Sequence, residues 1–407
     1  MEAGKTQVFK PWAVFILAIL MAGLCAGHDK HIEPRKLAST TDRPGSISID
    51  CGVSEDYPDE QSGIHYKSDS NFVTAGENKQ VLPRYIPTHP QLGKMLNTLR
   101  SFPNGKKNCY NLKPEMGKGY NYMIRGFFFY GNYDGQNKPP AFDVYLGVNY
   151  WLTVNFSDDT TFYYNEIIQF LWTDTINVCL LNTDFGIPII SGLELRFLNN
   201  SIYQIESKSK VLRAVRYDMI TNTSVSRYKD DVYDRLWRHY SIPEAKIIEG
   251  NANIDIQASN NIYEIPMEVL NTAAQPPSRL DSLNYLFNAS YFHRGSLSWS
   301  SRDLYVYFHL AEIVNTTKDQ QREISITLNG VKLPPITLEY LKPQSIGPQI
   351  FPVKGIANIS IEATAESTLP PLLNAFEIYE VHNLLTSPTN TVDGTKFYYY
   401  YFIFKSN

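Results

Sequence analysis

Three segments of the sequence return in the same order roughly 180 residues further on. The matching pairs are residues 142–151 with 324–333, 188–195 with 371–378, and 122–130 with 305–313. A period of this length is that of a whole domain rather than of a solenoid repeat. The chain has 407 residues, which is more than one hydrophobic core usually supports. The sequence therefore predicts an internal duplication with two domains.

Apolar and polar residues alternate in several short segments of both copies. Examples are residues 193–197, 324–328 and 359–362. Alternation with a period of two places one face of a strand in a core and the other face in water. We therefore predict an all-β fold of two tandem antiparallel β-sandwich modules of jelly-roll type, over residues 46–205 and 210–382.

Turn-forming pairs separate the predicted strands. The pairs are Asn-Gly at 329–330, Asp-Gly at 134–135 and Pro-Pro at 139–140. The Asn-Gly pair directly follows a strand-like segment and is the strongest hairpin signal. Helical periodicity is weak, and the best helical candidates are residues 89–99 and 231–240.

The N-terminus has the layout of a cleaved signal peptide over residues 1–27. Lys5 and Lys10 precede an apolar stretch at residues 12–24, and small residues follow it. This stretch is too short to cross the ~30 Å hydrocarbon core of a bilayer as a helix. The sequence therefore predicts export, with no membrane span in the mature chain.

Sequons for N-linked glycosylation support export. Each has Ser or Thr two residues after an asparagine, and the acceptors are Asn155, Asn199, Asn222, Asn288, Asn315 and Asn358. We expect them on surface loops or strand edges of a secreted glycoprotein. The formal net charge of −4 lacks the basic excess that binds nucleic acids or anionic lipids, so neither is an expected partner.

Three cysteines lie in the predicted mature chain. Cys51 and Cys109 stand beside turn-rich polar sequence, which favours a Cys51–Cys109 disulfide. Cys179 lies within an apolar run and is expected to be a buried small hydrophobe. No CxxC or HxxxH spacing accompanies these residues, so we expect no metal site.

Several strings of the sequence resemble the malectin-like domains of plant extracellular receptors. They are residues 49–52, 100–105, 109–110, 125–135, 231–237, 263–266, 272–274 and 308–312. Their order is similar to the tandem arrangement carried by leucine-rich-repeat receptor kinases, and the likeness covers residues 46–382. The resemblance implies a carbohydrate-binding-module-like fold, named for an animal lectin that holds a glucosylated glycan between aromatic rings and a carboxylate.

The C-terminal residues 383–407 depart from the pattern of this family. Family members of this type continue into a leucine-rich repeat segment, a membrane span and a kinase, whereas an irregular tail is expected here. Its aromatic run at residues 396–404 is too short to span a bilayer. Two interpretations stay open, namely a truncated non-signalling fragment of a receptor kinase and a secreted ectodomain that acts as a soluble decoy or co-receptor fragment.

The loop that follows residue 129 is the candidate ligand-binding site. Tyr130, Asn132, Tyr133 and Asp134 combine two phenols with an amide and a carboxylate. Pyranose rings have apolar C–H faces and hydroxyl edges, which suit such a mixture of aromatic and polar groups. In the alternative interpretation, the rings pack over the sandwich edge while Asp134 only helps to turn the chain.

Two ligand classes follow for the expected ectodomain. The first is cell-wall or glycan carbohydrate, bound by the pair of modules. The alternative is a secreted peptide or a co-receptor, with an interface that depends on the inter-module residues 201–216.

No catalytic constellation stands out. The sequence contains no HExxH or GxSxG string, and its histidines are scattered. Glu194 and Glu377 occupy equivalent positions of the two copies, and their apolar neighbours predict a structural role as acceptors for backbone or arginine donors. His309 is expected to be a partly buried packing residue. We therefore expect no enzymatic activity and no cofactor.

Overall fold

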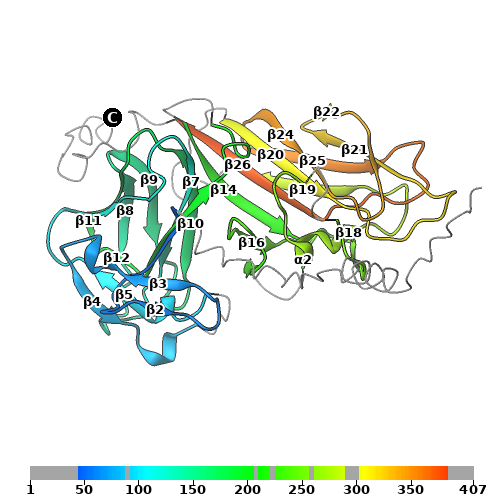
Figure 1. The fold of residues 1–407 in the computed structure, drawn as a ribbon. Helices are drawn as coiled ribbons and strands as arrows, with labels where there is room; N and C mark the ends of the chain where they lie inside the picture. The colour runs from blue at the N-terminus through cyan, green and yellow to red at the C-terminus, as the bar shows by residue number, and fades with distance from the viewer. Residues whose placement is uncertain are drawn as a thin grey trace, which may run out of the picture. The chain divides into compact units, whose positions relative to one another are not determined.

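The computed structural model describes residues 45–87, 92–205, 210–220, 225–255, 261–288 and 302–383. The predicted signal peptide, Asn222 and the predicted tail beyond residue 383 lie outside these ranges. The described part is almost entirely β-structure (Figure 1), which confirms the predicted all-β class. None of its helices has the length and apolar character that a membrane crossing requires.

The strands form two successive groups, one for each copy of the repeat. The first group comprises β1 (Ile47–Asp50), β2 (Tyr57–Pro58), β3 (His65–Ser68), β4 (Glu77–Gln80), β5 (Thr98–Ser101), β6 (Lys107–Leu112), β7 (Asn121–Phe128), β8 (Ala141–Leu146), β9 (Asn149–Asn155), β10 (Tyr163–Phe170), β11 (Ile176–Phe185), β12 (Ile189–Ile190) and β13 (Gly192–Leu198). The second comprises β14 (Lys210–Asp218), β15 (Val225–Arg227), β16 (Leu236–His239), β17 (Lys246–Glu249), β18 (Thr272–Gln275), β19 (Leu283–Asn288), β20 (Arg302–Leu310), β21 (Arg322–Leu328), β22 (Val331–Lys332), β23 (Ile336–Leu338), β24 (Gln344–Val353), β25 (Ile356–Ala363) and β26 (Ala375–Asn383). The described helices are short: η2 (Asp69–Asn71), η3 (Pro83–Tyr85), η4 (Met95–Asn97) and α2 (Met267–Leu270).

The two groups repeat one pairing pattern. β7 pairs with β10 and β13, and β20 pairs in the same way with β24 and β26. β8 pairs with β9 and β11, and β21 pairs with β22 and β25. β11 then pairs with β6, and β25 pairs with β19. The repeated sequence segments thus fold twice into the same arrangement of strands.

β14 belongs to both groups. It pairs with β10 at Ile167–Arg213 and Ile168–Leu212, and with β26 along its whole length. Figure 1 shows β14 between these strands, in a sheet whose order is β2-β3-β1-β13-β7-β10-β14-β26-β20-β24. Residues 210–216, where the predicted inter-module segment overlaps the predicted second module, therefore belong to a central strand of a shared sheet.

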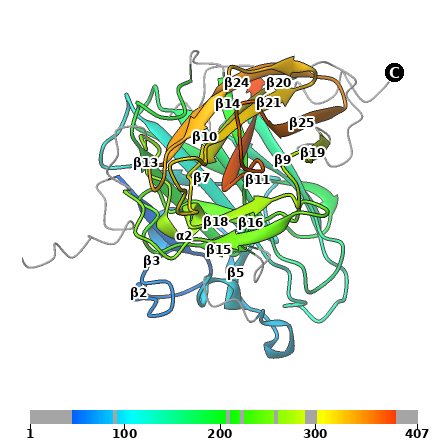
Figure 2. The same ribbon diagram turned by 90° about the vertical axis from the view of Figure 1, so that its right-hand side faces the viewer.

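Each group also surrounds a hydrophobic cluster. Val178 and Leu180 of β11 contribute to the first cluster, and Ile359 and Ile361 of β25 contribute to the second. These side chains come from alternate positions of their strands, as the period-two pattern requires. β15 and β16 pair with each other and lie below β20, β21 and β24 in the view of Figure 2.

The described residues of the two helical candidates form no α-helix. The described part of the first, residues 92–99, forms turns, η4 and the start of β5. Residues 231–240 form turns followed by β16. Asp231 and Arg235 form a buried ion pair across this turn.

The Asn-Gly hairpin is confirmed. Asn329 and Gly330 connect β21 to β22 and have φ of 47° and 84°. Two successive positive φ values match the twist of a tight two-residue hairpin, and Asn followed by Gly tolerates them best.

The disulfide joins Cys109 to Cys179, and Cys51 is a free, buried thiol. Cys109 and Cys179 stand directly opposite each other in the antiparallel pair of β6 and β11. The predicted Cys51–Cys109 bridge is therefore wrong. Strand pairing brings together cysteines that are 70 residues apart, and the polarity of the flanking sequence carries no information about that pairing.

Candidate functional site

The predicted ligand loop follows β7 and is held by its own side chains. The Tyr130 hydroxyl donates to Asp134 Oδ1 at 2.6 Å, and Asn132 Nδ2 donates to Asn137 Oδ1 at 2.7 Å. Tyr130 and Asn132 are completely buried, and Asn132 has a φ of 47°. These two residues therefore fix the shape of the loop.

Tyr133 and Asp134 are the two predicted residues with accessible surface. The Tyr133 ring packs edge-on against Tyr130, with ring centroids 5.7 Å apart, and its hydroxyl lies 3.1 Å from Ser101 Oγ. Tyr133 is half-buried and Asp134 is exposed. The packing interpretation thus describes Tyr130, whereas Tyr133 and Asp134 reach the surface.

The turn after β11 lies against the same loop. A Cβ atom added to Gly186 would lie 2.8 Å from the Cβ atom of Pro140, which shows how closely the two segments approach. Next to this glycine, Phe185 is 73% exposed and Ile187 is 37% exposed. An exposed aromatic ring therefore stands close to the segment that carries the predicted ligand residues, although no sequence motif marks it.

Five of the predicted glycosylation acceptors lie in the described ranges, and all five are exposed. They are Asn155, Asn199, Asn288, Asn315 and Asn358. Asn155 and Asn288 end their strands, whereas Asn358 lies within one. Exposure meets the steric requirement for carrying a bulky glycan.

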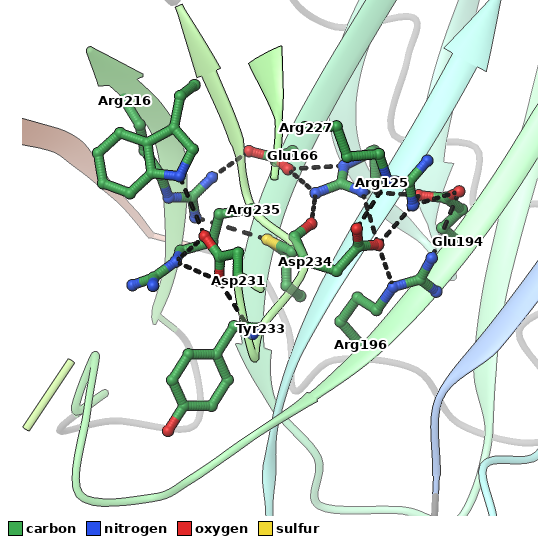
Figure 3. Close-up of polar contacts among 12 residues, drawn as sticks. Arg125, Glu166, Glu194, Arg196, Arg216, Arg227, Asp231, Tyr233, Asp234 and Arg235 are labelled. Atoms are coloured by element: carbon green, nitrogen blue, oxygen red, sulfur yellow. Dashed lines mark hydrogen bonds and ion pairs between the residues drawn. The ribbon is translucent and has the colours of Figure 1, made fainter. Parts of the chain in front are cut away.

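A buried network of arginines and carboxylates lies where β15 and β16 meet the strands of the first group (Figure 3). Arg125 donates to Glu194 Oε2 and to Glu166 Oε1, each at 2.6 Å. Arg227 donates to Glu194 Oε1 at 2.9 Å and to Asp234 Oδ1 at 2.7 Å. All of these side chains are buried.

Glu377, the counterpart of Glu194, has a different set of donors. Arg216 Nε donates to it at 2.7 Å, the Tyr203 hydroxyl donates at 2.8 Å, and His309 Nε2 lies 2.9 Å away. The predicted role of both glutamates as acceptors for arginine donors is confirmed. His309 is fully buried rather than partly buried, and its role is polar rather than only packing.

Glu166 links the ion pairs around Glu194 to those around Glu377. One carboxylate oxygen accepts from Arg125 and the other accepts from Arg216, so a continuous chain of charged groups runs from Glu194 to Glu377. Figure 3 shows Glu166 between the two guanidinium groups. Because β10 carries Glu166 and β14 carries Arg216, this chain crosses the pairing of the two strand groups.

The segment 231–237, one of the strings that resemble the family, contributes residues to the ion pairs around Glu194 and around Glu377. Asp234 accepts from Arg196 Nε at 2.6 Å on one side. Asp231 accepts from Arg235 Nε at 2.9 Å and from Trp237 Nε1 at 3.0 Å on the other. Sequence reasoning missed this role, because charged residues usually lie at a surface; their alternation with aromatic residues was the available signal.

The arginines of the network keep Glu194, Asp234 and Glu377 ionised. Burial opposes the ionisation of Glu194, but Arg227 and the other arginines outweigh burial and lower the pKa of this carboxyl. The same balance lowers the pKa of Asp234 and, with help from His309, the pKa of Glu377. Carboxylates held in this way are poor proton donors near neutral pH, so the network suits a scaffold better than proton transfer. The described residues contain no cluster of three or more potential metal ligands.

The family model of the malectin-like domain matches residues 49–381. This chain belongs to the malectin-like family. Its malectin-like relatives include a putative leucine-rich repeat receptor-like serine/threonine-protein kinase of Arabidopsis thaliana, 37% identical over 368 residues that cover 88% of this chain and 40% of the relative. The probable kinase MEE39 of the same plant is 34% identical over 373 residues, with coverage of 88% and 40%. The chain thus spans less than half of the length of these relatives.

Solved malectin-like structures share the fold. The ANX1 ectodomain of Arabidopsis thaliana superposes with a TM-score of 0.65 at 15% identity, covering 83% of this chain and 96% of that one. A solved complex of the plant peptide RALF23 with FER and LLG2 contains a chain with a TM-score of 0.62 at 17% identity, covering 85% and 98%. At these identities the likeness establishes the architecture of the malectin-like chain.

Proposed function

We propose that this malectin-like chain is the ligand-recognition ectodomain of a receptor-kinase-type protein at the cell surface. Family membership and the kinase relatives support a recognition role outside the cell, and the exposed acceptor asparagines support export. The observation that carries the proposal is a division of roles among the polar and aromatic groups. Buried ion pairs hold the strands together, whereas Tyr133 and Asp134 are accessible on the loop after β7 and Phe185 is exposed at the end of β11.

Carbohydrate is the first ligand class that we propose. The exposed ring of Phe185 offers an apolar face for a pyranose, and Asp134 offers acceptors for its hydroxyl groups. Tyr133 lies between the surface and the buried Tyr130, which supports its ring. In this proposal Tyr130 and Asn132 position the loop, and Tyr133 and Asp134 contact the sugar.

Calorimetric titration with cell-wall oligosaccharides tests this site. We expect dissociation constants on the order of 1 mM, and Tyr133→Ala or Phe185→Ala should weaken binding at least about tenfold. Tyr150→Ala is the matched control, because Tyr150 is 38% exposed but lies on β9. Unchanged affinity in the Tyr133 and Phe185 variants, with the fold intact by circular dichroism, would contradict the site.

A secreted peptide bound together with a co-receptor is the second candidate. It is favoured by the solved complex in which FER, a fold neighbour, appears with the peptide RALF23 and with LLG2. A pull-down with a panel of secreted peptides separates the two classes. Peptide recognition predicts binding that needs no sugar, tolerates Tyr133→Ala and falls when the exposed Ser201 and Gln204 are changed to Ala.

For either ligand class, we propose binding without turnover. The purified chain should release no reducing sugar from plant polysaccharides, because the equivalent glutamates Glu194 and Glu377 are held ionised by their arginine partners. Measured hydrolysis that disappears in Glu194→Gln would defeat this part of the proposal.

A further inference from the structure

The outer face of the paired strands β19 and β25 carries large apolar side chains in water. In β19, Leu283, Tyr285 and Phe287 point into the core, whereas the alternate residues are exposed. One of these is Leu286, which is 65% exposed, and β25 adds Ile356, which is 58% exposed. Outward positions of a half-buried antiparallel sheet are normally polar, so this pair needs an explanation.

Each exposed apolar residue stands directly opposite a glycosylation acceptor. The register of the two strands pairs Leu286 with Asn358 and Ile356 with Asn288. All four side chains are exposed and belong to the same outer face, because positions two apart on a strand share a face. Figures 1 and 2 both show β19 and β25 side by side. The two sequon asparagines therefore alternate with the two apolar side chains, both along each strand and across the strand pair.

We propose that N-linked glycans on Asn358 and Asn288 cover Leu286 and Ile356, so that sugar shields this face of the sheet. Directly opposite residues of an antiparallel pair have Cβ atoms about 5 Å apart, and diagonal ones are about 7–8 Å apart. The first sugar of either glycan is therefore attached within reach of both apolar side chains. Its C–H face covers them while its hydroxyl groups stay in water.

The attachment uses ordinary secretory chemistry. The Nδ2 atom of each asparagine forms a bond to the anomeric carbon of an oligosaccharide carried on a lipid diphosphate. The bond between that carbon and the phosphate oxygen breaks, the lipid diphosphate leaves, and Nδ2 loses one proton. Ser360 completes the sequon of Asn358, and Ser290 completes that of Asn288.

The position of β19 gives the shield a second effect. Among the described strands, β19 pairs with β25 alone, and its sequence Leu-Asn-Tyr-Leu-Phe-Asn contains neither charge nor proline. A strand of this kind invites pairing with a second molecule, and natural proteins usually block such pairing with charges, bulges or covers. Glycans at Asn288 and Asn358 provide such a cover. The inference requires export of the chain but neither class of ligand, so its failure would leave the recognition proposal unaffected.

Glycopeptide mass spectrometry of the secreted chain is the first test, and both sites should be occupied. The double variant Asn288→Gln/Asn358→Gln should then bind at least about twice as much of an apolar dye as the wild type and should self-associate in sedimentation velocity. Asn199→Gln is the matched control, because Asn199 lies in the turn after β13 rather than in a paired strand. It should remain monomeric with unchanged dye binding.

Two further experiments test the proposal if the double variant is not secreted. Endoglycosidase trimming of the folded wild type should raise dye binding in the same way. Adding Leu286→Thr and Ile356→Thr to the glycan-free protein should restore the monomer and abolish the dye signal. Unmodified asparagines in the secreted protein, or a glycan-free protein that stays monomeric without binding dye, would overturn the proposal.

Discussion

The two halves of the molecule repeat one strand pattern but compensate the equivalent glutamate differently. Three guanidinium groups lie within ion-pair distance of Glu194: those of Arg125, Arg196 and Arg227. Glu377 has two, those of Arg216 at 2.7 Å and Arg235 at 3.9 Å, together with a histidine and tyrosine hydroxyls. The comparison teaches that the repeated strand fixes where the carboxylate lies, whereas residues outside the repeated segments, such as Arg216 and Arg227, decide how its charge is balanced.

The outer faces of the equivalent strand pairs differ as well. β6 and β11 of the first half are joined by the Cys109–Cys179 disulfide, whereas β19 and β25 carry Leu286 opposite Asn358. A covalent link therefore secures one strand pair, and we assign a covering glycan to the other.

The largest expected effect comes from neutralising the first glutamate. Glu194→Gln should lower the free energy of unfolding by about 3–5 kcal/mol, because it leaves three buried arginines with too few carboxylates. Glu377→Gln should lower it by only about 1–3 kcal/mol, because Arg216 keeps Glu166 and His309 stays neutral. Urea denaturation of both variants measures the difference, and equal losses would break the comparison.

Removing the disulfide should come next. Cys109→Ala/Cys179→Ala should lower the free energy of unfolding by about 2–4 kcal/mol. Hydrogen exchange should rise in β6 and β11 and stay unchanged in β19 and β25, since only the first half contains the bridge. Cys51→Ala is the control for cysteine removal and should cost about 1 kcal/mol through a small cavity. Loss of protection in both halves would show that the strand groups do not unfold separately.

Each half also has a buried carboxyl group at the end of a strand, and these two groups make the stability of the protein depend on pH. Asp50 ends β1 and accepts from the Tyr57 hydroxyl at 2.5 Å, and Asp218 ends β14 and accepts from Tyr228 at 2.7 Å. Burial raises the pKa of Asp50 to about 7 and that of Asp218 to about 6. The unfolded chain ionises such groups near 4, so between about pH 4 and these values the native state binds more protons. Its stability therefore falls as the pH rises through that window.

Asparagine variants remove these contributions. Between pH 5 and pH 7, the free energy of unfolding of the wild type should fall by about 2 kcal/mol more than that of Asp50→Asn. It should fall by about 1 kcal/mol more than that of Asp218→Asn, because the pKa of Asp218 is lower and its pH range ends earlier. Denaturant titrations at both pH values measure this. A wild type whose pH dependence matches that of Asp50→Asn would show that Asp50 is ionised in the native state.

The smallest effect should come from an exposed ion pair. Lys106 Nζ lies 2.7 Å from Asp184 Oδ2, with both side chains largely in water. Lys106→Ala should change the free energy of unfolding by less than about 1 kcal/mol. A loss comparable to that of Glu194→Gln would mean that burial is not what makes the network important.

Local sequence properties predicted the class of fold. Period-two alternation identified β21 and β25, and the Asn-Gly pair identified the hairpin at Asn329, because both signals arise from neighbouring residues. The helical candidate at residues 231–240 failed because pairing with β14 and β15 places its second half in the strand β16. The shared strand β14 was missed because its partners, β10 and β26, lie far away in the sequence.

The candidate site was predicted in part. The loop from Tyr130 to Asp134 was found from its composition, yet composition does not reveal that Tyr130 and Asn132 point inward. The disulfide depended on a pairing between distant strands. The arginines that bind Glu194 come from β7, β13 and β15, and no local pattern connects them.

The placement of β26 has a mechanical consequence. This strand lies between β14 and β20, and it is hydrogen-bonded to β14 over nine successive residue pairs. Tension applied along the strand at Asn383 is opposed by these bonds all at once, in shear, rather than one after another as in a peeled hairpin. Resistance to pulling at Asn383 is then governed by the unfolding barrier rather than by equilibrium stability.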